Sequence, residues 1–243
     1  MTGMRPAGDV LRDMRHLPFA DLDAIAPGTS LVLAPHPDDE TLGCGGLIIE
    51  ACTRGRPPLI VAVTDGSASH KSFPPERLQA MRAEELRAAA EILGVGRERV
   101  CFLGLADAQA PDQGPVFAAA VAAVARCIRT HAISTLLASW EHDQHCDHQA
   151  TARIAAAAAR MTGVRLLFYP VWGWLLRADH PLPDLPVRGA RLDVAAVLAR
   201  KRTALAAHAS QYSALLADDP DGFRLPADLL EATLREDEVF LEA

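Results

Sequence analysis

Short apolar runs alternate with helical patterns along the chain from about residue 30 onward. The runs are continuously apolar rather than alternating with polar residues, which is typical of strands that are buried on both faces of a parallel sheet. We therefore predict five strands, over Ser30–Ala34, Leu59–Thr64, Val100–Leu103, Thr135–Ser139 and Leu166–Tyr169.

Two of the intervening segments carry apolar residues at helical spacing. Arg77–Leu93 places Leu78, Met81, Ala89 and Ile92 near one face, and Gly94 follows as the residue that ends the helix. Phe117–Ile128 has a similar apolar stripe. Repeated strand, helix and strand units with short loops predict right-handed crossovers. We expect an α/β fold, a Rossmann-like open, mostly parallel sheet with helices on both faces.

The last third of the chain changes in composition. Asp179–Pro186 is rich in proline, and we interpret it as a loop that separates the sheet core from a small C-terminal add-on. After it, Asp193 is expected to cap a helix that runs to about His208, and the acidic tail Glu236–Ala243 is expected to form a last strand. We predict one domain over residues 1–243, with a core over about 28–212 and the add-on over about 187–243.

Composition and charge narrow the class of protein. Half of the 243 residues are hydrophobic, which excludes a largely disordered chain. The formal net charge of −7 disfavours nucleic acid or an anionic membrane as a partner. The sequence has neither a membrane span nor the uninterrupted apolar stretch of a signal peptide near its start. Five cysteines without a C-x-x-C pair indicate neither a disulfide framework nor a cysteine zinc site, so we expect a cytoplasmic protein.

Candidate chemistry is concentrated in the loop after the first predicted strand. In open α/β sheets ligands bind outside the carboxyl ends of the strands, and here the sequence is His36-Pro37-Asp38-Asp39-Glu40. A helix N-terminus would account for one or two of these acids, but it would not account for the histidine or for three mutually repelling carboxylates. The glycines that follow do not make a dinucleotide-binding loop, because the third glycine position is Ile48.

A second cluster follows the fourth predicted strand, in the segment Trp140–His148. Three of the nine histidines, His142, His145 and His148, fall within it, at the same end of the sheet as His36. Zinc in hydrolases commonly takes three ligands from histidine and carboxylate and keeps one position open for water. His36, Asp39 and one histidine of the second cluster could supply this set.

The two clusters resemble the signature motifs of the PIG-L/LmbE-like family of zinc-dependent N-deacetylases. The motifs are His36-Pro37-Asp38-Asp39-Glu40 and His145-x-Asp147-His148. The resemblance covers about residues 30 to 212 and continues through Thr64-Asp65-Gly66, Arg82-x-x-Glu85-Leu86, Leu93-Gly94 and Lys201–Gln211. One departure is Pro35, which stands between Ala34 and His36 where the family usually has alanine directly.

The resemblance implies roles for the clustered residues. His36, Asp39 and His148 would bind zinc, and Asp38 would be the general base. His145 would stabilise the oxyanion or protonate the leaving amine. From its position we add Asp143 as a residue that holds His145 in orientation.

Each of the remaining candidates has a structural alternative to a role in the site. Asp65 could line the pocket or form a turn, Arg82 could contact substrate or lie in solvent, and His208 could contact substrate or brace a loop. The tryptophans after the fourth and fifth strands could face a sugar ring or pack in the core: these are Trp140, Trp172 and Trp174. Cys44 and Cys146 are expected to be packing residues.

Together these features predict a zinc-dependent hydrolase, an amidohydrolase acting on linear amides. It would remove an N-acyl group, with acetyl expected, from a small-molecule amino sugar or its conjugate. Two alternatives stay open: a non-haem iron oxygenase with a site of two histidines and one carboxylate, and a catalytically silent module whose metal only orders a pocket. The sequence leaves the sugar, the aglycone and the oligomeric state open.

Overall fold

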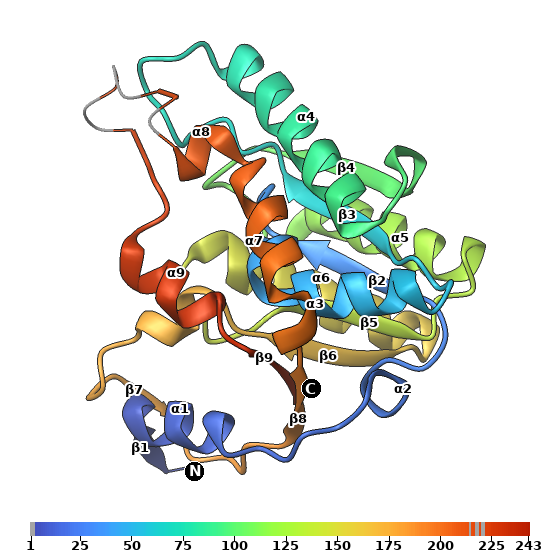
Figure 1. The fold of residues 1–243 in the computed structure, drawn as a ribbon, viewed down its shortest axis with the longest axis vertical. Coiled ribbons are helices and arrows are strands. Elements are labelled where there is room, and N and C mark those ends of the chain that lie inside the picture. The colour runs from blue at the N-terminus through green and yellow to red at the C-terminus, as the bar shows by residue number, and fades with distance from the viewer. Residues whose placement is uncertain (1–2, 214, 217–218, 220–221) are drawn as a thin grey trace.

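The protein is described by a computed structural model that covers residues 3–213, 215–216, 219 and 222–243. Within these residues seven strands form one sheet in the order β4-β3-β2-β5-β6-β9-β8 (Figure 1). Neighbouring strands from β4 to β6 pair in parallel, and β9 pairs antiparallel with both β6 and β8. The strands are β2 (Ser30–Ala34), β3 (Leu59–Thr64), β4 (Val100–Leu105), β5 (Thr135–Ser139), β6 (Arg165–Tyr169), β8 (Gly189–Asp193) and β9 (Asp237–Glu242).

Helices cover both faces of this sheet, which confirms the predicted architecture. The central strand β2 shows why its sequence is apolar throughout: Val32 belongs to one core, whereas Leu31 and Leu33 belong to the core on the opposite face. The first core is completed by α3 (Asp39–Thr53), α4 (Pro75–Leu93), α7 (Leu198–Ala206) and α9 (Ala227–Thr233). The second is completed by α1 (Ala7–Arg15), α5 (Gly114–Thr130) and α6 (Cys146–Thr162).

Short elements complete the described chain. They are α2 (Leu22–Ile25), α8 (Ala209–Tyr212) and the 3-10 turns η1 (Arg97–Arg99), η2 (Trp172–Leu175) and η3 (Ala195–Val197). None of the helices in the described ranges combines the length and the apolar character needed to cross a lipid bilayer.

The proline-rich segment Asp179–Pro186 is not wholly a loop. It contains β7 (Pro181–Pro183), which pairs antiparallel with β1 (Met4–Pro6) in a separate two-stranded ribbon. Prolines are tolerated there because a two-stranded ribbon leaves strand edges that need no N–H donor. The ribbon joins the start of the chain to the segment after β6 (Figure 1).

The helix expected to start at Asp193 begins later. Asp193 is the last residue of β8 and pairs with Asp237 of β9, while its Oδ1 accepts a hydrogen bond from the Ala195 N–H at 3.0 Å. The turn η3 then leads into α7. Strand pairing therefore holds Asp193 outside the helix, whereas the last strand is confirmed as β9. β8 and β9 extend the main sheet, and the domain limits stay a prediction.

Two contacts fix the chain where it leaves β2. The carbonyl of Pro35 accepts hydrogen bonds from the backbone N–H and the hydroxyl of Thr64, at 3.0 and 2.8 Å, so the additional proline is held against β3. Gly43 lies so close to Tyr169 that a Cβ there would overlap the ring. These contacts place the first turns of α3 over the ends of the central strands.

Candidate metal centre and active site

Two imidazole nitrogens converge on one carboxylate oxygen, and the three groups come from two loops. Asp39 Oδ2 lies 3.2 Å from His36 Nδ1 and 3.1 Å from His148 Nε2. Asp39 opens α3, directly after the β2 loop, and His148 lies in the first turn of α6, after β5. All three residues are buried. The parallel sheet brings the two motifs together at the carboxyl ends of adjacent strands.

The hydrogen bonds of the two histidines show which nitrogen faces Asp39 as an acceptor. His148 Nδ1 lies 2.8 Å from Asp143 Oδ2, and His36 Nε2 lies 3.1 Å from Asp147 Oδ2. Carboxylates accept hydrogen bonds, so these nitrogens carry the protons in the neutral rings. The other nitrogen of each ring then directs a lone pair at an oxygen that also only accepts. His148 Nε2 is buried and has no hydrogen-bond partner among the described residues. A cation fits among these three acceptors.

The charges around the site also favour a cation. Although burial acts to lower it, the carboxylates of Asp39 and Asp143 raise the pKa of His148 to about 9. Burial acts to raise the pKa of Asp39, but His148 and His36 outweigh this effect and hold the pKa of that carboxyl well below its usual range. The buried carboxylates therefore stabilise positive charge at this point. Two imidazoles and one carboxylate are a ligand set that zinc and similar divalent ions accept.

His145 lies beside this set but is hydrogen-bonded differently. One nitrogen each of His36, His145 and His148 lies within 4.8 Å of the others, so distance alone does not separate the two histidines of the second motif. His145 Nδ1, however, accepts the backbone N–H of Asp147 at 3.2 Å and caps α6. Burial and the neighbouring His36 and His148 lower the pKa of His145 to about 4. The neutral ring therefore carries its proton on Nε2 and is suited to donate.

Asp38 is a buried carboxylate that lies outside the group of three acceptors. Its backbone has φ 139° and ψ −28°, a conformation that costs about 1–3 kcal/mol in a residue other than glycine. Glu40 Oε2 accepts the Asp38 N–H at 3.0 Å, and Arg82 Nη2 donates to Asp38 Oδ2 at 3.2 Å. Burial raises the pKa of Asp38 to about 7, against the opposing effect of Arg82. Arg82 therefore holds this carboxylate at the lining of the cavity.

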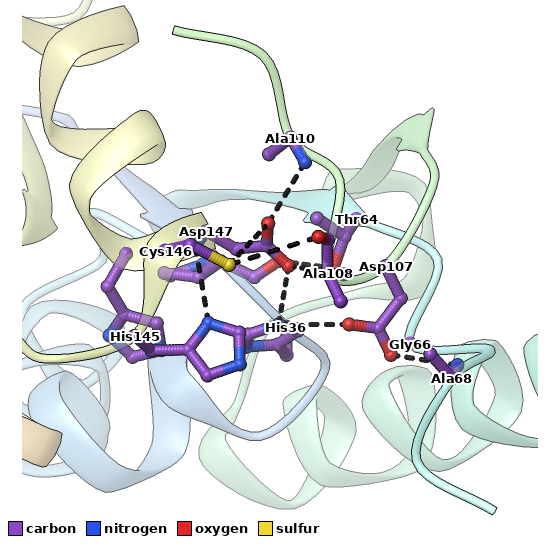
Figure 2. Close-up of polar contacts among 12 residues, drawn as sticks. His36, Thr64, Gly66, Ala68, Asp107, Ala108, Ala110, His145, Cys146 and Asp147 are labelled. Atoms are coloured by element: carbon purple, nitrogen blue, oxygen red, sulfur yellow. Dashed lines mark hydrogen bonds and ion pairs between the residues drawn. The ribbon is translucent and has the colours of Figure 1, made fainter.

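Two further carboxylates hold His36, and neither of them had a predicted role. Asp147 and Asp107 both face His36 Nε2, at 3.1 and 3.3 Å (Figure 2). Asp147 also accepts the N–H groups of Ala108 and Ala110, at 2.7 and 2.9 Å, which ties the loop after β4 to the second motif. Asp147 is part of the motif His145-x-Asp147-His148, and Asp107 lies just after the end of β4. Asp107 was missed because β4 continues past Gly104, at positive φ, to Leu105.

Asp143 does not hold His145, contrary to the prediction. Its carboxylate accepts from His148 Nδ1 and from the backbone N–H groups of Val171, Trp172 and Gly173. It is fully buried between the loop after β5 and the turn η2. The backbone donors of η2 draw the carboxylate to the ligand side of the loop, so Asp143 orients His148.

A cavity of about 470 Å³ opens onto these groups. Of the predicted catalytic and ligand residues, His36, Asp38, Asp39 and His145 line it, and of the predicted substrate contacts Arg82 and Trp172 do. Arg82 is buried and donates to the carbonyls of Pro37 and Gly66 as well as to Asp38. In the part of the chain that the structure describes, its Nε has no hydrogen-bond partner. The other lining side chains were not among the predicted site residues, and they include Leu42, Ser69, Lys71, Gln144, Gln211, Phe223 and Leu225.

Three predicted substrate contacts lie outside this cavity. Trp140 is buried in the core on the α5 and α6 face. Its backbone N–H donates to the Tyr169 carbonyl, which continues the strand pairing and keeps the side chain in that core. Asp65 accepts the N–H groups of Ser67 and Asp107 and so supports two loops. His208 is buried beneath the site, with Nε2 3.2 Å from Glu40 Oε1. It braces the glutamate that supports Asp38.

Three other residues singled out from the sequence have clear positions. Cys44 is fully buried in the core, as expected. Cys146 is exposed at the start of α6, so its interpretation as a packing residue is wrong. Trp174 lies against Arg15, whose guanidinium carbon is 5.4 Å from the ring centroid, and it does not line the cavity.

Comparison with solved structures finds the same fold. N,N'-diacetylchitobiose deacetylase from Pyrococcus horikoshii superimposes with a TM-score of 0.66 at 18% sequence identity, over 96% of this chain and 89% of that one.

Comparison with curated proteins finds relatives that cover most of the sequence. One is 1D-myo-inositol 2-acetamido-2-deoxy-alpha-D-glucopyranoside deacetylase of Rhodococcus opacus (strain B4), 28% identical over 87% of this chain and 90% of the relative. Another is the probable N-acetyl-alpha-D-glucosaminyl L-malate deacetylase 2 of Bacillus anthracis, 28% identical over 75% and 81%. The model of the family described as PIG-L, GlcNAc-PI de-N-acetylase, matches residues 31–159, which contain both motifs. The chain therefore belongs to the PIG-L family of de-N-acetylases.

Proposed function

We propose that the protein is a zinc-dependent hydrolase that removes an acetyl group from the nitrogen of an amino sugar or its conjugate. The observation that carries the proposal is the convergence of His36 Nδ1, Asp39 Oδ2 and His148 Nε2 beside a cavity that also contains the spare carboxylate of Asp38. The deacetylase relatives support the same reaction.

His36, Asp39 and His148 would hold the zinc ion. When bound, zinc polarises the amide carbonyl and lowers the pKa of the attacking water. The second set of carboxylates, Asp143 behind His148 and Asp147 behind His36, keeps the two rings in the tautomers that a metal requires.

Asp38 and His145 would carry out the proton transfer and the charge stabilisation. Asp38 accepts the proton of the water that attacks the carbonyl carbon, because Asp39 belongs to the ligand set and Asp107 is held by His36 Nε2 and the backbone N–H of Ala68. The Nε2–H of His145 donates to the carbonyl oxygen as negative charge develops there. Collapse of the tetrahedral intermediate breaks the C–N bond, and the proton held by Asp38 is available to the leaving amine.

The substrate would be a small N-acetylated glucosamine derivative. Both curated relatives are named for the deacetylation of acetamido sugars joined to a second group, inositol in one and malate in the other. Arg82 and Trp172 line the cavity and are the predicted substrate contacts that fit this proposal.

The cytoplasmic location stays a prediction, and the five cysteines are free thiols in the structure.

The two alternatives lose support at the same residues. An iron oxygenase would leave Asp38 without a role, although the fold maintains this carboxylate in a strained conformation. A silent binding module would require neither the base nor a His145 ring that caps α6 through Nδ1 and keeps Nε2–H free to donate. The family relatives are deacetylases, which supports neither alternative.

A panel of substrates tests the proposal. We expect the zinc-loaded protein to release a primary amine and acetate in equal amounts from at least one of free N-acetylglucosamine, its glycosides, and its lipid or thiol conjugates. Oxygen consumption is measured in parallel with iron-loaded protein. Oxygen uptake without acetate release would favour the oxygenase, and zinc-loaded protein that is inert toward the whole panel would contradict the proposed reaction.

A further inference from the structure

The cavity has two chemically different walls. One wall carries the titratable groups described above. The other is apolar and consists of Leu42, Trp172, Phe223 and Leu225. The Trp172 and Phe223 ring centroids are 5.8 Å apart with an interplanar angle of 56°, an arrangement usual for packed aromatic pairs. These four residues pack together as part of the core on the α3 face, so the wall is continuous with the protein interior.

The apolar wall is fixed relative to the metal ligands. Asp143 Oδ2 accepts the backbone N–H of Trp172 at 3.1 Å, and the same oxygen is 2.8 Å from Nδ1 of His148. Leu42 lies one helical turn beyond Asp39, and its N–H donates to the Asp38 carbonyl at 2.9 Å. A group resting on this wall would therefore lie at a set distance from the reacting amide.

The main-chain bonds of Phe223 and Leu225 fix the outer part of the wall. The Phe223 N–H donates to the Ser69 carbonyl and the Leu225 N–H to the Gln211 carbonyl, both at 2.9 Å. These contacts hold the two side chains against the loop after β3 and against α8.

The charges in the cavity do not suit an anionic group beyond the sugar. Three carboxylates, Asp38, Asp39 and Asp107, line the cavity, and the guanidinium of Arg82 is already used by Asp38 and two carbonyls. Lys71 is an exposed cation at the cavity lining. An apolar group gains from leaving water at such a wall, whereas a carboxylate would lose its hydration there without gaining a hydrogen-bond partner.

We infer that Leu42, Trp172, Phe223 and Leu225 form a subsite for an apolar aglycone, so that the enzyme prefers acetamido sugars bearing an aryl or alkyl group. This inference rests on the proposed function and adds the chemistry of the group next to the sugar. The cavity volume of about 470 Å³ falls in the range of roughly 300–1,000 Å³ that holds drug-sized ligands, which leaves room beyond one sugar ring.

The test compares three substrates that differ only in the group on the anomeric oxygen. These are free N-acetylglucosamine, its phenyl glycosides and its carboxymethyl glycosides, with both anomers of each glycoside. We expect kcat/KM for the better phenyl anomer to exceed that of the free sugar by roughly 10- to 100-fold, as burial of one apolar group permits. The gain should appear mainly in KM, because the wall contacts substrate and transition state equally.

Two variants and a matched control locate the preference. Trp172→Gln and Phe223→Gln each remove part of the wall and should reduce the phenyl preference, the ratio of kcat/KM for phenyl glycoside to that for free sugar, to about threefold or less. Phe223 has no assigned contact with the sugar, so Phe223→Gln should also keep the rate on free sugar. The control is Trp174→Gln, on the same turn η2, because Trp174 lies against Arg15 outside the cavity. It should keep the full preference. Thermal melts of each variant show whether the protein is folded.

Binding separates this inference from the proposed function. The phenyl glycosides and the free sugar are titrated by calorimetry into zinc-loaded Asp38→Asn protein, in which hydrolysis is slow. Tighter binding of a phenyl glycoside that is lost in Trp172→Gln supports the subsite even if no turnover is found. Equal binding and equal kcat/KM for phenyl glycoside and free sugar overturn it, as does a preference for the carboxymethyl glycoside, which would point to Lys71.

Discussion

Replacing Asp38 by asparagine should lower kcat by roughly 10²- to 10⁴-fold while the protein keeps one bound zinc ion. The amide has nearly the shape of the carboxylate, but it cannot accept the proton of the attacking water. Asp38 is not among the three converging acceptors, so the ligand set stays intact. Steady-state kinetics on the best substrate of the panel, with metal analysis of the same protein sample, measure both effects.

Asp39→Asn is the matched control, because it makes the same chemical change at the adjacent residue. Asp39 Oδ2 is the oxygen that both ligand histidines face, so this variant should lose metal affinity together with activity. If Asp38→Asn lost the metal and Asp39→Asn retained it, the assignment of base and ligand would be reversed.

Alanine substitutions should separate the two histidines of the second motif. His148→Ala removes a nitrogen that points at Asp39 without a hydrogen-bond partner, so zinc affinity and activity should both fall. His145→Ala should retain zinc and lose roughly 10²- to 10³-fold in kcat with a smaller change in KM, as expected when one oxyanion donor is deleted. Zinc titration and kinetics on the two purified variants distinguish these outcomes.

His142→Ala is a suitable control for this pair. His142 belongs to the same loop, but its ring lies 5.2 Å from the Trp140 ring and does not line the cavity, so zinc and activity should be unchanged. Loss of metal from His145→Ala would make His145 a ligand. The site would then have one protein ligand more than we propose.

The positions of strands and motifs could be predicted because they depend on local pattern. Continuous apolar runs located the five parallel strands, and the topology of a parallel sheet then placed both motifs at one edge. The end of α4 at Gly94 followed from the left-handed conformation that glycine adopts easily, observed at φ 102°. The strands and the end of α4 each depend on the residue types within a short stretch of sequence.

The direction of side chains in the loops could not be predicted in the same way. Asp143 lies against His148 because the backbone N–H groups of Val171, Trp172 and Gly173, nearly thirty residues later, also donate to its carboxylate. Trp140 was drawn into the core by the backbone pairing of its N–H with Tyr169. Phe223 and Leu225 reach the cavity from a segment without any recognisable motif. The positions of these side chains depend on which distant segments of the chain come into contact. The spacing of residues along the sequence carries little information about such contacts.

Zinc titration of metal-free protein tests the central claim most directly. Protein stripped with a chelator should neither release acetate nor produce free amine from the best substrate of the panel. With added zinc, activity should rise linearly, reach its plateau at one equivalent per chain, and give acetate and amine in equal amounts, because two loops provide one set of three ligands. The melting temperature should rise in parallel, since the ion binds the folded state. Full activity in protein without metal would contradict the account. So would metal-free protein that binds one equivalent of zinc, with the expected rise in melting temperature, but still releases no acetate.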